Sequence, residues 1–350
     1  MTPDVAAVGR RWGRWAVSRL ASAIVVIGVA AIATFLLARM LPGDPVAHLA
    51  SGMGANAAGL TALRHRLGLD LPLPVQLAHY LRGLLEGNWG QSFATGEPVL
   101  RALRERLPAS LELTLAGLIL STAIGIPLGI AAACRRRGVI ALLYRWLTAA
   151  GIGLPSFVIG LLLIHVFYFR LGWAPEPSGR ADAFAIAPPT HTGFLLIDAW
   201  LAHDGVAWRD AFAHLLLPAA TMALFGLAPL ARMTHSAMSQ ALDSAPVRTA
   251  RSLGLPRFRV LRDYALAQAA ASIVTAFGMV ASYLLAANVA VERVFAWPGI
   301  GSYALDALSA SDYPALQGFV LMVAIVFAVW NLLIDALTAA LDPRVAEWEQ

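Results

Sequence analysis

The chain of 350 residues contains no lysine, a single cysteine and little charge of either sign. The absence of lysine excludes a phosphate-binding loop of the form G-x-x-x-x-G-K-[ST], because no lysine is available to reach the phosphates of a nucleotide. If ATP drives this protein, the ATPase is therefore another chain. The single cysteine, Cys134, excludes an internal disulfide and a zinc site built from several cysteines.

Motifs for hydrolytic and metal chemistry are also missing. The sequence has neither H-E-x-x-H nor G-x-S-x-G, and its eight histidines are scattered without an i,i+4 pair. We therefore predict no catalytic residue, no metal site and no cofactor bound by this chain. A membrane serine protease built from Ser156, Ser302 and His165 is an alternative, but no motif brings these three residues together.

The composition indicates a membrane protein. Hydrophobic residues make up 59% of the chain and charged residues only 13%, whereas a soluble domain carries about 25% charged residues. A net charge of +5 in a soluble chain would suggest a nucleic-acid partner. Here the arginines gather at the ends of apolar runs, where they orient a membrane protein. We therefore expect membrane lipids, and not nucleic acid, among the partners.

Six segments are apolar enough to span a bilayer, which takes about 20 mostly apolar residues. They are 20–41, 111–133, 146–169, 211–233, 269–291 and 318–341. They predict an all-α, multi-pass protein with six transmembrane helices. A self-contained carrier driven by protons or sodium remains an alternative. It usually has carboxylates near the middle of its spans, whereas Glu292 and Asp335 lie toward the ends of theirs.

The arginines predict the orientation. Fifteen of the 26 lie on the side of both chain ends, and of the other eleven, seven belong to the long first loop and its edge. Long loops count little in the positive-inside rule, so both termini are expected in the cytoplasm. The predicted organisation is a cytoplasmic N-terminus (1–19), a first transmembrane helix (20–41), an external loop region (42–110), a five-helix core (111–341) with a cytoplasmic loop (235–268), and a cytoplasmic tail (342–350).

Residues 243–254 form a polar island between the fourth and fifth apolar segments. Either Asp243 or Ser244 can accept a hydrogen bond from the first amides of a helix, and Pro246 suits its first turn. Gly254 is placed to end the helix in a left-handed conformation. The island therefore predicts one short helix that begins after Leu242.

The pattern of the island predicts an amphipathic elbow. At about 100° per residue, one face of its helix holds Leu242, Ala245, Thr249 and Leu253, and the other holds Ser244, Arg248 and Arg251. A second short helix is expected after Pro256, with Phe258, Leu261 and Ala265 opposite Arg257, Arg259 and Arg262. On the inner face of a membrane protein, this elbow predicts a docking surface for a cytosolic partner. The alternative is an interfacial hairpin whose arginines contact lipid headgroups.

The island resembles the cytoplasmic EAA loop of ABC importer permeases, in the variant found in the dipeptide/oligopeptide/nickel group. The matching residues are Val247, Arg248, Thr249, Ala250, Arg251, Gly254 and Leu255. Further stretches similar to this family are 41–46, 67–72 with 87–93, and 292–301. Four motifs in the right order, with six spans, make the chain resemble a B-type permease of this family.

The resemblance implies a subunit of an ATP-driven, binding-protein-dependent type I importer, most simply for di- or oligopeptides. Nickel, glutathione or a peptide-like antibiotic are alternative cargoes. The implied partners are a second, C-type permease, two cytosolic ATPases that carry ATP and Mg²⁺, and an external substrate-binding protein, assembled at the bacterial cytoplasmic (inner) membrane. The seven matching residues are implied to couple the chain to an ATPase. No substrate-binding residue follows from the resemblance.

Overall fold

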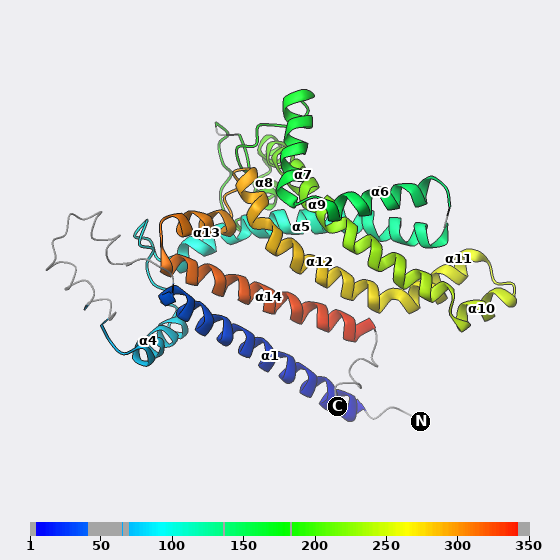
Figure 1. The fold of residues 1–350 in the computed structure, drawn as a ribbon, viewed down its shortest axis with the longest axis horizontal. Helices are drawn as coiled ribbons and strands as arrows, with labels where there is room; N and C mark the ends of the chain where they lie inside the picture. Colours follow the sequence, from blue (N-terminus) through cyan, green and yellow to red (C-terminus); the bar gives the residue numbers. More distant parts are fainter. Residues whose placement is uncertain (1–4, 41–64, 66–69, 136, 183, 342–350) are drawn as a thin grey trace.

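The computed structural model of the chain describes residues 5–40, 65, 70–135, 137–182 and 184–341 (Figure 1). Their regular structure is helical, apart from one isolated antiparallel bridge between Gln91 and Pro98. Within these residues, five helices are long and apolar enough to cross a membrane. They give the candidate spans Ala16–Leu37, Val99–Cys134, Gly205–Leu242, Arg257–Val294 and Tyr313–Ala340. The prediction of an all-α multi-pass protein is confirmed.

The centre of the bundle is formed by α5 (Val99–Cys134), α9 (Gly205–Leu242) and α12 (Ala267–Val294). Small residues let α5 and α9 approach closely. A Cβ added at Gly129 would lie 2.6 Å from the carbonyl oxygen of Ala231. Leu113, Met222 and Leu284, one from each helix, are fully buried in the central apolar cluster. The three helices therefore form the buried core of the molecule.

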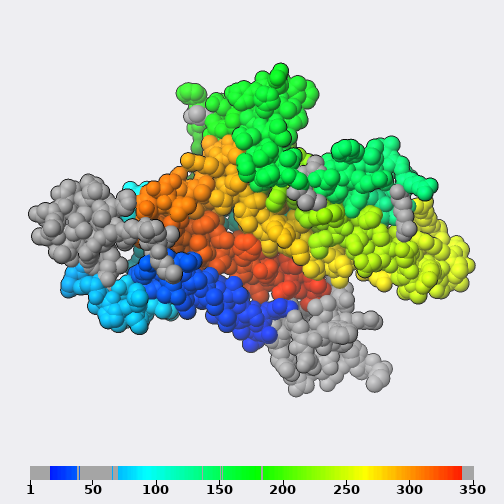
Figure 2. Space-filling model, viewed as in Figure 1, coloured from blue at the N-terminus to red at the C-terminus, as the bar shows by residue number. Residues whose placement is uncertain are grey.

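Helices α1 (Val5–Met40) and α14 (Tyr313–Leu341) lie side by side along one edge of the bundle (Figures 1 and 2). Many of their large apolar side chains are exposed, including Val25 and Leu37 on α1 and Leu333 on α14. Side chains of this kind suit contact with lipid tails or with another membrane helix. This pair therefore carries an outward-facing apolar surface of the protein.

The predicted third span, 146–169, is not one helix. The chain forms α6 (Val139–Gly153), α7 (Ser156–Leu163) and a π-helical segment η1 (Ile164–Arg170), and α7 turns away from the direction of α6 (Figure 1). Leu154 is extended, with φ −115° and ψ 130°. Pro155 causes this break because it disfavours helical geometry in the residue before it and has no N–H to donate.

Short helices mark the two ends of the bundle. Helix α10 (Ala245–Ser252) lies at the right in Figure 1, on the side of the first residues of α1 and the last of α14. Helices α4 (Leu73–Leu85) and α13 (Ile300–Ser309) lie at the opposite end. The family-like stretch 41–46 lies outside the described residues. Helix α5 already begins at Val99, so its first turns fall within the predicted loop region 42–110.

Candidate functional site

The polar island forms the short helix that its sequence predicts. Helix α10 follows α9 and is joined by a turn to α11 (Arg257–Arg259). The second helix differs from the prediction, because α11 continues through the π-helical segment η2 (Val260–Leu266) into α12. No proline or glycine interrupts the chain from Arg257 until Gly278, so the helix has no local reason to end. The elbow is therefore one short helix set against the start of a span.

The two ends of α10 are stabilised differently. At the start, the Ser244 hydroxyl donates to the carbonyl oxygen of Ala241 at 2.7 Å and makes no side-chain cap to α10, so capping by Ser244 is not confirmed. At the end, Gly254 has φ +75°. Its amide donates to Arg251 and the amide of Leu255 donates to Ala250, at 3.0 and 3.2 Å. This pair of hydrogen bonds is the Schellman arrangement, and the left-handed Gly254 is confirmed.

Helix α10 is anchored to the bundle by two small apolar residues. Val247 and Ala250 are 0% and 2% exposed and join an apolar cluster with Met238, Val260 and Ala265. The predicted division of faces is therefore wrong, and Leu253 is 74% exposed. A helix of two turns between two fixed connections takes its orientation from those connections, and not from its own pattern.

The remaining side chains of α10 and its turn form an outward-facing surface, which we call the α10 surface. It consists of Arg248, Thr249, Arg251, Ser252 and Leu253, all exposed. In the described part of the chain, no salt bridge to Arg248 or Arg251 is formed. A cationic surface with an exposed leucine, on a helix fixed from behind, is suited to bind an acidic cleft on another protein.

A cavity of about 760 Å³ opens beside this surface. Arg251 and Asp243 line it together with Arg257, whose Nη2 donates to the carbonyl oxygen of Cys134 at 3.4 Å. The cavity thus lies between the end of α5 and the α10 turn. If a side chain of a docked partner entered this cavity, it would contact both elements. The end of α5 and the α10 turn would then move together.

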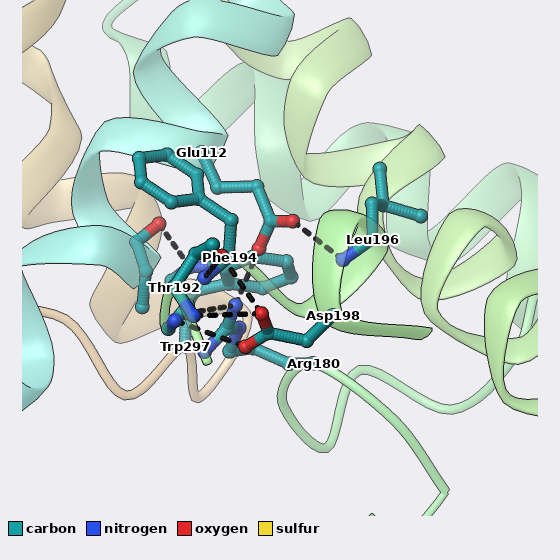
Figure 3. Close-up of polar contacts among 9 residues, drawn as sticks. Glu112, Arg180, Thr192, Phe194, Leu196, Asp198 and Trp297 are labelled. Atoms are coloured by element: carbon teal, nitrogen blue, oxygen red, sulfur yellow. Dashed lines mark hydrogen bonds and ion pairs between the residues drawn. The ribbon is translucent and has the colours of Figure 1, made fainter. Parts of the chain in front are cut away.

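A second polar cluster lies between α5 and the connection that follows η1 (Figure 3). Arg180, from the connection after η1, forms a salt bridge to Glu112 of α5, with 2.6 Å between Nη2 and Oε2. The other oxygen of Glu112 accepts the amide of Leu196, in the first turn of α8 (Leu195–Leu201), at 2.9 Å. Arg180 also donates to the carbonyl oxygen of Gly193 at 2.9 Å. One buried carboxylate thus fixes Arg180 and the start of α8 to α5.

Asp198 holds the residues just before α8 in place through hydrogen bonds to its carboxylate. Its carboxylate accepts hydrogen bonds from the amide and hydroxyl of Thr192 and from the amide of Gly193, at 2.8 to 2.9 Å. Burial alone would raise the pKa of Asp198, but these hydrogen bonds to the ionised form outweigh it and hold the pKa below its ordinary value. The segment before α8 is therefore an ordered loop with a charged anchor.

We expect an Arg180→Ala variant to release this connection without unfolding the bundle. The change leaves Glu112 buried without its counter-charge, which costs about 3 kcal/mol, and this cost is relieved when the connection opens and water reaches the carboxylate. Limited proteolysis should then cut within 172–194 much faster than in the parent protein, while the thermal midpoint of the bundle changes little. Adding Glu112→Gln removes the uncompensated charge and should restore much of the protection. Equal cutting rates in the parent and Arg180→Ala would contradict this role.

The family-like stretch 292–301 is organised around one buried carboxylate. Glu292, at the end of α12, is 0% exposed and accepts hydrogen bonds from the Ser110 hydroxyl at 2.5 Å and from the Asn288 amide at 2.8 Å. Its other oxygen accepts the amide of Ser302, in the first turn of α13, at 2.8 Å. A carboxylate at a helix N-terminus is favourably placed. Glu292 therefore ties α5, α12 and α13 together.

Gly299 is required by this arrangement. A Cβ at this position would overlap the Glu292 carboxylate and the Ser110 hydroxyl. We expect Gly299→Ala to destabilise the folded protein by about 1–3 kcal/mol, the usual cost of overpacking. The thermal midpoint in detergent should fall, whereas Gly28→Ala, where a Cβ meets nothing within 4 Å, should leave it unchanged. An unchanged midpoint in Gly299→Ala would show that the cluster adapts.

Sequence reasoning missed Glu112 and Arg180. Their partnership joins residues 68 positions apart, so no local pattern reveals it. The available signal was Glu112 itself, a carboxylate at the start of an apolar segment, where a charge needs a partner. Within the described ranges, no group of three or more His, Cys, Asp or Glu side chains is placed to hold a metal ion.

The chain matches two family profiles. The one described as "Binding-protein-dependent transport system inner membrane component" matches residues 125–347, which include α10. The one for the N-terminal part of such membrane components matches residues 13–114. Together they cover both the α10 surface and the α1 edge of the molecule.

Several bacterial proteins are similar over almost their whole length. The probable D,D-dipeptide transport system permease protein DdpB of Escherichia coli is 42% identical over 323 residues, which is 92% of this chain and 94% of that protein. The di/tripeptide transport system permease protein DppB of Pseudomonas aeruginosa is 39% identical, over 89% of this chain and 92% of that protein. The dipeptide transport system permease protein DppB of Escherichia coli is 37% identical, with the same two coverages.

Proposed function

This chain belongs to the family of binding-protein-dependent transport system inner membrane components, and we propose that it is a permease subunit of an ATP-driven importer of di- or oligopeptides. The similarity to permeases of dipeptide and di/tripeptide transport systems supports a short peptide as the cargo. The α10 surface carries the proposal for the mechanism. It is a short cationic helix held rigidly between two spans, as a subunit driven by a separate ATPase requires.

The proposed assembly has four further subunits: a second permease, two cytosolic ATPases and an external binding protein. ATP and Mg²⁺ belong to the ATPases, which agrees with the absence of lysine from this chain. The outward-facing apolar surface of α1 and α14 is available for the second permease or for lipid. The substrate passes between the two permeases.

The proposed orientation places the α10 end in the cytoplasm of a bacterial inner membrane. The arginines of the α10 turn and of α11, including Arg251, Arg257 and Arg259, gather at this end, as the positive-inside rule requires. The broken unit formed by α6, α7 and η1 serves as the sixth span, so that both termini lie on the cytoplasmic side.

Coupling follows from how α10 is held. The ATPases move toward each other when they bind ATP, and a helix seated on one of them moves with it. Because Val247 and Ala250 join α10 to the ends of α9 and α12, this displacement is passed to the two spans and to α5. Arg248 and Arg251 make the charged contacts, Thr249 and Leu253 fit the cleft, and Gly254 supports the turn.

Uptake in a strain that lacks its own peptide importers tests this function. Cells that express the chain with its neighbouring genes should take up radiolabelled dipeptides, and uptake should stop when the ATPases carry a substitution of their phosphate-loop lysine. Uptake of nickel or glutathione in place of dipeptides would contradict the proposed cargo. Ion-gradient-driven uptake by the purified chain alone in liposomes would contradict the importer.

A further inference from the structure

A second cavity, at the end of the bundle opposite α10, is not used by the proposed function. It lies where α1, α4 and α14 meet (Figure 1) and has a volume of about 320 Å³. One wall is the stretch Asn88–Gly90, part of the family-like motif that the coupling role leaves unexplained. This volume is at the small end of the range for ligand sites.

The backbone of that wall is built to hold its shape. Gly87 and Gly90 have φ +78° and +84°, a left-handed geometry that favours glycine. The amide of Asn88 donates to Gly83 of α4 at 2.8 Å, and the side-chain oxygen of Asn88 accepts the amide of Gly90 at 3.1 Å. The intervening Trp89 lines the cavity. The wall is therefore a fixed turn that places Trp89 beside the cavity.

The cavity holds a cation without a counter-charge in the described residues. Arg39 donates through Nε and Nη2 to one oxygen of Gln76, at 3.1 and 2.7 Å, and its guanidinium lies 4.1 Å from the ring centre of Phe35. No salt bridge to Arg39 is formed within the described ranges. Its remaining nitrogen, Nη1, makes no hydrogen bond to those residues. Arg39 is thus held in place with both N–H donors of Nη1 unused by the described residues.

A second residue with an unused donor lies beside the same cavity, on α14. Gln317 lines the cavity, and its side-chain nitrogen is buried with no hydrogen-bond partner in the structure. A buried donor left without a partner costs about 1–3 kcal/mol. Arg39 and Gln317 together therefore favour an acceptor that carries negative charge.

The position of the cavity indicates which kind of molecule would supply this negative charge. The candidate span of α1 ends at Leu37, and Arg39 follows two residues later, at the level where arginine reaches the phosphates of a bilayer. Trp89 and Tyr80, both lining the cavity, are the aromatic types found at this level. The exposed apolar side chains of α1 and α14, including Leu37, continue from the cavity toward the middle of the bilayer.

We infer that this cavity binds the phosphate of a membrane phospholipid from the leaflet at that end. The phosphate accepts hydrogen bonds from Arg39 and Gln317, and the acyl chains lie along α1 and α14. The family-like stretch Asn88–Gly90 forms one wall of the site. The bound lipid holds α4 and its following turn against the two helices.

Native mass spectrometry of the full-length chain, extracted from membranes in mild detergent, tests this site. The parent protein should retain one phospholipid through delipidation. Arg39→Gln and Gln317→Leu should each lower its occupancy by about tenfold or more, the effect of losing one hydrogen bond to a charged group. Arg82→Gln is the matched control, because it removes an exposed arginine of α4 that pairs with Glu86. Equal retention in Arg39→Gln and Arg82→Gln would overturn the proposal.

Adding lipid back to delipidated protein separates the possible sources of phosphate. Phosphatidylglycerol should raise the thermal midpoint of the parent protein, and the rise should be lost in Arg39→Gln and in Gln317→Leu. Diacylglycerol with the same chains but no phosphate should have no such effect. An equal rise with diacylglycerol would overturn the site, because it would show that the phosphate is not needed. An equal rise with water-soluble glycerol 3-phosphate alone would also overturn it, because it would favour a soluble phosphate ligand.

Discussion

A Gly254→Pro variant is expected to lose about a hundredfold or more of its transport activity while its spans remain folded. Gly254 has φ +75° and donates its amide to Arg251. Proline fixes φ near −65° and has no N–H, so the turn that ends α10 cannot form. A proline in an incompatible position costs roughly 3 kcal/mol, which lowers the population of the native elbow by about a hundredfold.

Gly254→Ala is the matched control for this prediction. A Cβ at Gly254 meets nothing within 4 Å, so alanine suffers only the cost of the left-handed conformation, about 1 kcal/mol. Peptide uptake should therefore fall only several-fold in Gly254→Ala. Both variants should keep the thermal midpoint of the parent protein. Normal uptake by a well-expressed Gly254→Pro variant would show that the shape of the elbow is irrelevant to transport.

Reversing the charge of Arg251 is the second change with a large expected effect. Arg251 is exposed on the α10 surface, so Arg251→Glu leaves the apolar cluster behind α10 intact. If the guanidinium meets an acidic group of the ATPase, the substitution replaces attraction by repulsion, and losing such a pair costs about 2–5 kcal/mol. The ATPases should no longer copurify with the chain, and uptake should be abolished.

The control for Arg251→Glu is the same reversal at the other end of the bundle. Arg104 is exposed on α5, and Arg104→Glu makes the same change in net charge. It should leave copurification of the ATPases and transport close to the parent level. Equal losses in the two variants would mean that the net charge of the chain, and not contact at α10, controls assembly.

Local chemistry made α10 predictable from the sequence. Pro246 and Gly254 are signals that act within a few residues, and the observed helix, Ala245–Ser252, has Pro246 in its first turn and ends before Gly254. Its orientation was not predictable. Val247 and Ala250 face inward because α5, α9 and α12 present a cluster of apolar residues at that point, and this depends on the packing of distant segments.

The same limit explains the other differences. Hydropathy along 146–169 indicates only that the segment is apolar, and membrane helices often tolerate a proline, so Pro155 alone did not predict that the helix breaks there. The link from Arg180 to Glu112 joins two elements far apart in the sequence. Gly299 was visible as part of a motif, but the reason for it, the buried carboxylate of Glu292, is a tertiary contact.

Site-directed cross-linking from α10 tests the central claim most directly. In a background where Cys134 is replaced by serine, a Thr249→Cys variant places the only thiol of the chain on the α10 surface, and Thr95→Cys places it on an exposed site at the opposite end. In membranes that contain the whole importer, a short bifunctional thiol reagent should link Thr249→Cys, but not Thr95→Cys, to an ATPase that carries a cysteine in its permease-binding cleft. No cross-link from Thr249→Cys in a transport-competent importer would contradict the coupling role of α10.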